Sequence, residues 1–230
     1  MLSTLTAMKR LSILLTAALI GAAAACAGSP DYSRFTTFYG QRATLFDMLP
    51  MDSRTIVMLG NSITNGCEWA ELLGNSNVVN RGISGDTVEG IQARLGSIIK
   101  AAPAKIFLMI GVNDVSHDLT ADSIATSIGE LVHRIRTQSP ATKLYLQSLL
   151  PVNQSFGRFR KLDGKEQVIR DINAMLPAIA EREGATFINL YPLMSDADGN
   201  LRTDLTNDGL HLLGPAYLVW RDAIMPYINE

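Results

Sequence analysis

The feature that most constrains the fold of this chain is the regular alternation of short apolar runs with longer amphipathic stretches. The apolar runs are rich in Ile, Val and Leu and predict strands at residues 54–59, 77–81, 105–110, 143–148 and 186–190. The amphipathic stretches predict helices at residues 33–49, 65–73, 87–100, 122–137, 167–183 and 214–228. Strands that alternate with helices of this length form a parallel sheet with helices on both faces. We therefore expect an α/β fold built on a five-stranded parallel sheet.

The composition suits a single folded domain and excludes several other classes of protein. Hydrophobic residues make up 47% of the 230 residues and charged residues 18%, which excludes an intrinsically disordered chain. The 20 basic and 22 acidic residues give a net charge of −2, so nothing in the overall charge favours nucleic acid as a partner. The sequence leaves the oligomeric state open.

The first residues have the pattern of an export signal. Lys9 and Arg10 precede an uncharged, mostly apolar run that extends from Leu11 to Ala25 and is too short to span a bilayer comfortably. We expect a signal peptide at residues 1–25, a tether at 26–32 and one domain at 33–230. The alanines before Cys26 resemble a bacterial lipoprotein processing site, which implies a lipidated Cys26 and a location in the cell envelope, in the periplasm or at the outer membrane. Ordinary cleavage and release as a secreted or periplasmic protein stays open, and membrane contact is expected only through the anchor.

A serine stands where the first predicted strand meets the first helix. Ser62 follows Gly60 and Asn61, and such a position places free backbone N–H groups beside the side-chain oxygen. This arrangement suits a nucleophile whose attack creates an oxyanion nearby. A helix N-cap is the alternative, because Ser, Thr and Asn all fill that position well.

A nucleophilic serine needs a base, and the chain has only three histidines. His133 falls in the middle of a predicted helix, and His117 falls in a loop without a further His or Cys for a metal site. His211 follows Asp208 by three residues on a predicted turn, so one carboxylate can reach the imidazole and set its tautomer. A surface turn with an incidental histidine stays open as the alternative. No metal or other cofactor is expected.

Two further residues follow predicted strands and could stabilise negative charge. Gly82 offers a backbone N–H after the second strand, and Asn113 offers a side-chain amide after the third. With the N–H of Ser62 they would make three donors around one oxyanion. The alternative for residues 82–85 is a turn of phosphate-binding appearance, but the full G-x-G-x-x-G pattern of a dinucleotide site is missing.

Taken in order along the chain, these motifs resemble the SGNH (GDSL-type) hydrolases. The narrower resemblance is to the branch of the platelet-activating-factor acetylhydrolase catalytic subunits and bacterial secreted acetylesterases. The residues that carry it lie at positions 82–87, 94–95, 149–151 and 208–212. The resemblance implies a three-layer α/β/α sandwich of flavodoxin-like type and a metal-free esterase that forms an acyl-enzyme.

The resemblance also implies a role for each candidate residue. Ser62 would be the nucleophile, His211 the general base and then the acid, and Asp208 the residue that orients His211. Ser62, Gly82 and Asn113 would form the oxyanion hole. The sequence departs from the family at Asn61, where aspartate is usual, which puts the level of activity in question.

The substrate expected from this resemblance is a short-chain ester, foremost an O-acetyl group on a carbohydrate. The loop at residues 152–165, termed the basic loop below, carries Arg158, Arg160 and Lys161 with Phe156 and Phe159. It could act as a cationic, aromatic lid for an anionic or sugar substrate, or it could be a solvated surface loop. Two other functions stay open: a lysophospholipase or thioesterase for longer acyl chains, and a catalytically weak glycan-binding lipoprotein.

Overall fold

A single parallel sheet organises the part of the chain that the computed structural model describes, residues 30–230. Within it, Tyr32–Glu230 form one compact unit. The strands lie in the order β2-β1-β3-β4-β5, and every neighbouring pair is parallel. Their bounds are β1 Ile56–Gly60, β2 Val78–Gly82, β3 Lys105–Met109, β4 Lys143–Gln147 and β5 Thr186–Ile188. The predicted five-stranded parallel sheet is confirmed. The predicted signal peptide and Cys26 lie outside the described residues.

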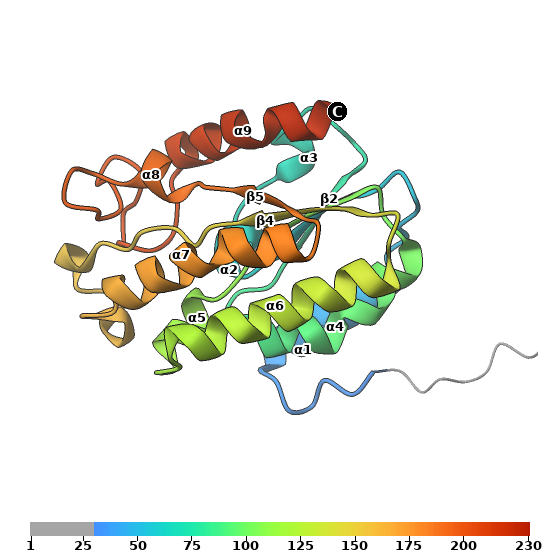
Figure 1. The fold of residues 1–230 in the computed structure, drawn as a ribbon, viewed down its shortest axis with the longest axis horizontal. Helices are drawn as coiled ribbons and strands as arrows, with labels where there is room; N and C mark the ends of the chain where they lie inside the picture. The colour runs from blue at the N-terminus through green and yellow to red at the C-terminus, as the bar shows by residue number, and fades with distance from the viewer. Residues whose placement is uncertain (1–29) are drawn as a thin grey trace, which may run out of the picture. The chain divides into compact units, whose positions relative to one another are not determined.

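Helices cover both faces of this sheet, as the sequence predicts (Figure 1). Helix α6 (Ala121–Gln138) packs between α4 (Val88–Ala101) and α7 (Glu166–Arg182) on one face. On the other face α3 (Trp69–Leu72) meets α9 (Gly214–Asn229), where the rings of Trp69 and Trp220 cross with 4.8 Å between their centroids. This arrangement confirms the three-layer α/β/α sandwich. None of the helices in the described part combines the length and apolar character needed to cross a membrane.

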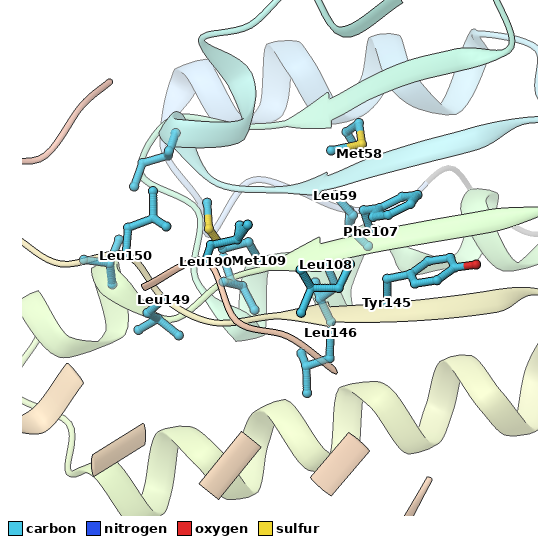
Figure 2. Close-up of a cluster of buried hydrophobic side chains, with 14 of the residues drawn as sticks. Met58, Leu59, Phe107, Leu108, Met109, Tyr145, Leu146, Leu149, Leu150 and Leu190 are labelled. Atoms are coloured by element: carbon cyan, nitrogen blue, oxygen red, sulfur yellow. The ribbon is translucent and has the colours of Figure 1, made fainter. Parts of the chain in front are cut away.

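The core lies between the sheet and its two helical layers. All residues of β1 and β3 are buried, because both faces of a parallel sheet are covered and its strands are therefore apolar throughout. Figure 2 shows the resulting cluster, in which side chains of β1, β3 and β4 pack against one another. The rings of Phe107 and Tyr145 stack with centroids 4.4 Å apart. This core holds the strand ends in fixed positions.

The first helical segment after β1 differs from its prediction. One helix was expected at 65–73, but the chain forms α2 (Ser62–Asn65) and then, after a break, α3. The side-chain amide of Asn80 donates to the carbonyl oxygens of Thr64, Asn65 and Cys67, which satisfies backbone groups that a continuous helix would have paired. Helical structure consequently starts three residues earlier than predicted, at the serine itself.

Four short helices occupy segments for which the sequence analysis predicted no helix. Two of them, α5 (Val112–Ser116) and α8 (Tyr191–Met194), follow β3 and β5 directly. The other two are 3-10 turns within the basic loop, η1 (Gln154–Phe156) and η2 (Arg160–Leu162). The basic loop therefore has regular structure of its own.

Helix α1 (Thr37–Met48) forms a second, smaller core against the sandwich. Tyr39 is buried and its hydroxyl donates to the carbonyl of Gly90 in α4 at 2.6 Å. The cluster also contains Tyr32, Ala43, Phe46 and Ile83. Tyr32 was predicted to belong to the tether, but it is buried in this cluster, and its hydroxyl donates a hydrogen bond to Asp47. Since Ile83 belongs to the loop after β2, α1 supports that loop from outside.

Candidate active site

Ser62 lies at the carboxyl end of β1, as the first residue of α2. Asn61 precedes it as the N-cap, and the Asn61 side-chain oxygen accepts the N–H of Ile63 at 3.0 Å. Asn61 is buried and makes the capping contact that an aspartate would make, without bringing a charge into this end of the sheet. The N–H of Ser62 stays unpaired among the described residues, as expected for the first turn of a helix.

The structure brings Ser62, His211 and Asp208 into one hydrogen-bonded chain. The Ser62 Oγ lies 2.9 Å from His211 Nε2, and His211 Nδ1 lies 2.8 Å from Asp208 Oδ2. A carboxylate only accepts hydrogen bonds, so Nδ1 carries the proton and Nε2 is left to accept the serine O–H. In this tautomer the imidazole can take the proton of Ser62 when its oxygen attacks a carbonyl carbon.

The turn at Asp208 is shaped by hydrogen bonds from its own backbone. Asp208 Oδ1 accepts the N–H groups of Leu210 at 2.9 Å and His211 at 2.8 Å. Burial opposes ionisation of Asp208, but these bonds and the contact with His211 outweigh it, so the pKa of the carboxyl is lowered. Gly209 has φ +87°, and a Cβ there would lie 2.1 Å from the carbonyl oxygen of Asn153. Only glycine fits this position.

The second group of predicted residues needs one correction, at Gly82. Its N–H donates to the side-chain oxygen of Asn80 at 2.8 Å, and it is the last residue of β2, packed against the backbone of α2. It is therefore not available as an oxyanion donor. Gly85, three residues later, lines the same pocket as Ser62 and has φ +81°. Its N–H has no partner among the described residues.

Asn113 lies in the pocket with Ser62, as predicted. One of its amide N–H groups donates to the carbonyl of Asp86 at 2.8 Å, which leaves the second free. The bond ties α5 to the loop that contains Gly85. Both glycines of the 82–85 segment were visible in the sequence, but the choice between them depended on where β2 ends.

A buried ion pair, which the sequence analysis did not assign, fixes this loop. Arg94 in α4 donates to Asp86 Oδ2 from Nε at 2.9 Å and from Nη2 at 2.7 Å. The same Nη2 reaches the carbonyl oxygens of Gly60 at 3.2 Å and Arg81 at 2.9 Å, at the ends of β1 and β2. Both side chains are almost fully buried. One guanidinium therefore joins two strand ends to the loop that precedes α4.

The pocket over Ser62 has a volume of about 670 Å³. Its apolar wall consists of Phe159, Leu162 and Leu210, and the ring of Phe159 meets the His211 ring edge-on at 5.2 Å. The rest of the lining residues carry polar or charged side chains or are glycine: Ser62, Ser84, Gly85, Asn113, Ser116, Arg158, Arg160, Lys161 and His211. The structure thus places Arg158, Arg160 and Lys161 at the predicted pocket, whereas Phe156 is not in its lining.

The other two histidines are not among the residues that line the pocket over Ser62. His133 pairs with Glu183 at 2.9 Å between α6 and α7, and His117 is the C-cap of α5. In the described part of the chain, no group of three or more His, Cys, Asp or Glu side chains could hold a metal ion.

Comparison with known proteins places these observations in a family. The sequence matches the GDSL-like lipase/acylhydrolase family over residues 58–217, a range that contains Ser62, Asp208 and His211. Human platelet-activating factor acetylhydrolase IB subunit alpha2 is 29% identical over 156 residues, covering 65% of this chain and 63% of the human one. The rat alpha1 subunit is 27% identical over 164 residues, covering 68% and 67%. The chain thus spans a little under two thirds of the alpha2 subunit.

Solved structures show the same architecture. A GDSL-like lipase from Bacteroides thetaiotaomicron superposes with a TM-score of 0.73 at 26% identity, covering 83% of this chain and 97% of the other. An acetylxylan esterase from Geobacillus stearothermophilus shares the fold, with a TM-score of 0.62 at 19% identity over 78% and 96% of the two chains. The family match covers well over half of the sequence. The chain accordingly belongs to the GDSL-like lipase/acylhydrolase family.

Proposed function

We propose that this chain is an exported serine esterase that removes short acyl groups, foremost acetyl, from carbohydrate esters through an acyl-enzyme. The observation that carries the proposal is the hydrogen-bonded chain from Ser62 through His211 to Asp208, of which Ser62 and His211 line the pocket. Such a chain supplies a nucleophile, its base and the group that orients the base. A non-catalytic binding role has no use for these two hydrogen bonds.

In the proposed acylation step, Ser62 Oγ attacks the ester carbonyl carbon while His211 Nε2 accepts the serine proton. The C–O bond to the alcohol then breaks, and the alcohol leaves with the proton that His211 returns. Water attacks the acyl-enzyme in the same manner and releases the carboxylic acid and free Ser62. Asp208 stays ionised and stabilises the imidazolium, since its pKa is lowered.

The oxyanion of each tetrahedral intermediate would be held by three donors. These are the N–H groups of Ser62 and Gly85 and the second amide N–H of Asn113. Gly85 takes the role that the sequence analysis gave to Gly82. Each such donor typically contributes about 10²–10³ in rate.

Two observations bear on which acyl group the enzyme would remove. The curated relatives are named acetylhydrolases, which supports acetyl as the acyl group. The wall of Phe159, Leu162 and Leu210 favours a second candidate, an esterase or thioesterase for longer acyl chains. The predicted export signal supports carbohydrate esters as the substrate, because an exported enzyme meets acetylated glycans outside the cytoplasm.

The experiment is acetate and acyl release by the purified protein beside its Ser62→Ala variant. The substrates are p-nitrophenyl acetate and octanoate, acetylated xylan and O-acetylated sialic acid. We expect activity on the acetyl esters that disappears in Ser62→Ala. A preference for octanoate would favour the second candidate, and absence of turnover by folded protein on all four would contradict the proposal.

The proposed location has its own test. Wild-type protein and a Cys26→Ala variant are expressed in a bacterial host, and membrane and soluble fractions are compared. A lipid anchor on Cys26 predicts that the wild type follows the membrane and the variant does not. Equal partition of the two proteins would contradict lipidation at Cys26.

A further inference from the structure

We propose that the pocket over Ser62 recognises esters whose alcohol part carries an anionic group, namely the carboxylate of an acidic sugar. The inference rests on the proposed function, because it describes the alcohol that leaves when Ser62 is acylated. Three cationic side chains carry it. Arg158, Arg160 and Lys161 line the pocket together with Ser62 and His211.

No acidic side chain of the described residues pairs directly with these three cations, although the charge of Lys161 contributes to the lowered pKa of Asp118. No acidic residue is among those that line the pocket. Within residues 30–230, none of the three side chains forms a hydrogen bond or an ion pair with another residue. The chain as a whole has a net charge of −2, so this pocket is positive against the overall balance. A cleft lined by one sign of charge concentrates ligands of the opposite sign.

The fourth cation of the basic loop shows the contrast. Lys165 Nζ forms an ion pair with Asp118 at 2.7 Å and donates to the carbonyl of Val115 at 2.9 Å. Its charge is compensated, and its contacts attach the end of the basic loop to α5. A structural use of a loop cation is therefore visible at Lys165 and is missing at the three residues that line the pocket.

The backbone that carries the three cations is fixed in place. Leu162 is buried in the main core, and its carbonyl accepts the side-chain amide of Gln154 at 3.1 Å. At the start of the loop the Asn153 N–H donates to the carbonyl of Gly209 at 2.8 Å, next to Asp208. The loop forms a wall of the pocket and is held at both ends. A charged group on a fixed backbone loses less freedom when it binds a ligand.

The position of the anion in the substrate follows from the proposed acyl group. Acetyl has no charge, so an anionic group can only belong to the alcohol part. Guanidinium groups form paired hydrogen bonds with a carboxylate, which favours the two arginines as its main partners. A uronic or sialic acid has such a carboxylate on the sugar ring itself. Sulfated and phosphorylated sugars share the anionic chemistry and serve as further arms of the test.

The experiment compares two substrates that differ only in charge. Acetylated glucuronic acid and acetylated glucuronamide have the same ring and the same acetyl esters, and acetate release gives kcat/KM for each. We expect wild-type protein to prefer the acid by about 10-fold or more at low ionic strength, and added salt to reduce the preference. Acetylated glucose 6-sulfate and 6-phosphate show whether any anion suffices or a carboxylate is required.

Two triple variants, each of which removes three positive charges, distinguish a binding site for the anion in the pocket from the electrostatic field of the whole protein. The pocket variant is Arg158→Gln/Arg160→Gln/Lys161→Gln. Its control, Lys100→Gln/Arg170→Gln/Arg221→Gln, removes three positive charges at residues that do not line the pocket. The acid-to-amide ratio should fall to about one in the pocket variant and persist in the control. Activity of the pocket variant should fall more on the acid than on the amide.

Several results would overturn the inference. These are equal kcat/KM for acid and amide in wild type, an unchanged ratio in the pocket variant, or an equal loss in the control. Binding of phosphatidylglycerol vesicles that disappears in the pocket variant, with no effect on the ratio, would assign the cations to a lipid surface instead. Ser62-dependent hydrolysis of both sugars without a charge preference leaves the proposed function intact. No hydrolysis of either ester by folded wild type contradicts the proposed function itself.

Discussion

At the scale of single residues, the Asp208–His211 turn sets the orientation and the tautomer of the proposed base, His211. Asp208 uses one carboxylate oxygen for two backbone N–H groups and the other for His211 Nδ1. The same carboxylate therefore shapes the turn and fixes the imidazole. The turn also requires Gly209, because its positive φ and the nearby Asn153 carbonyl exclude a side chain.

Asp208→Asn separates these two functions. Asparagine keeps the acceptor for the backbone, but its amide cannot hold the Nδ1–H tautomer. We expect kcat to fall by about 10³–10⁴ with little change in thermal stability. Asp204→Asn is the matched control, because Asp204 lies on the same segment and pairs only with exposed Arg202. Initial rates on p-nitrophenyl acetate and a thermal melt measure both effects, and Asp208→Asn activity above a tenth of wild type would contradict this role.

A second carboxylate, Asp114, makes stability depend on pH. It is buried next to Asn113, and burial raises its pKa to about 6 although both oxygens accept the N–H of Val88. The unfolded chain loses this proton near its ordinary pKa of 3.8. Between about pH 4 and pH 6 the folded state therefore holds more protons, and the free energy of unfolding falls as the pH rises.

Asp114→Asn should remove this dependence. Asparagine can accept the Val88 N–H without ionising, so the melting temperature of the variant relative to wild type should rise from pH 4 to pH 7. The difference in unfolding free energy can reach about 3 kcal/mol, as a shift of about two pKa units implies. Thermal melts of both proteins across this pH range test the prediction. Parallel curves would show that Asp114 does not titrate in this way.

The sequence predicted individual residues well where chemistry limited the choice. With three histidines in the chain, elimination left His211 as the candidate base and its spacing pointed to Asp208, while the resemblance to the SGNH hydrolases assigned their roles. The choice of Gly82 was wrong because its N–H, at the last residue of β2, donates to the Asn80 side chain, a contact that no sequence pattern indicates. The pair of Asp86 and Arg94 gave no local signal, since its partners meet only when α4 packs on the strand ends.

At the scale of elements, the loop before α4 is held from two sides. Arg94 binds it from within through Asp86, and α1 covers Ile83 from outside with Tyr39 and Phe46. The family match begins at residue 58, so α1 lies before the shared region. Two elements distant in sequence thus stabilise the segment that contains Gly85.

Arg94→Met tests the inner support. The change leaves the buried Asp86 carboxylate without its cation, which typically costs about 3–5 kcal/mol. We expect a matching loss in the free energy of unfolding by denaturant and a lower kcat. The double variant Asp86→Asn/Arg94→Met contains no buried charge and should recover part of the stability. A double variant less stable than Arg94→Met alone would show that the ion pair is not the main contribution of Arg94.

Element prediction succeeded for the strands and failed at the first helix after β1. Apolar runs predicted the ends of all five strands to within two residues, because a sheet with helices on both faces needs continuous apolar sequence. The break between α2 and α3 depends on Asn80, which lies on the next strand and caps three carbonyls from there. No sequence pattern within residues 62–73 predicts a contact with a side chain of the next strand.

At the scale of the whole molecule, the fold brings together candidate catalytic residues from four distant segments at one end of the sheet. Ser62, Gly85, Asn113 and His211 follow different strands and line one pocket. The predicted parallel sheet was enough to expect this meeting, since the carboxyl ends of parallel strands share one edge. The unpaired cations of the basic loop could not be predicted, because only the structure shows which of its cations form ion pairs.

The most direct test of the account is to trap the acyl-enzyme. Protein mixed with p-nitrophenyl acetate is quenched in acid and digested, and its peptides are analysed by mass spectrometry. We predict one acetyl group on the peptide that contains Ser62, none in Ser62→Ala, and a loss of turnover of about 10⁴-fold or more in that variant. Acetylation at another residue that accompanies turnover, or turnover that persists in Ser62→Ala, would contradict Ser62 as the nucleophile.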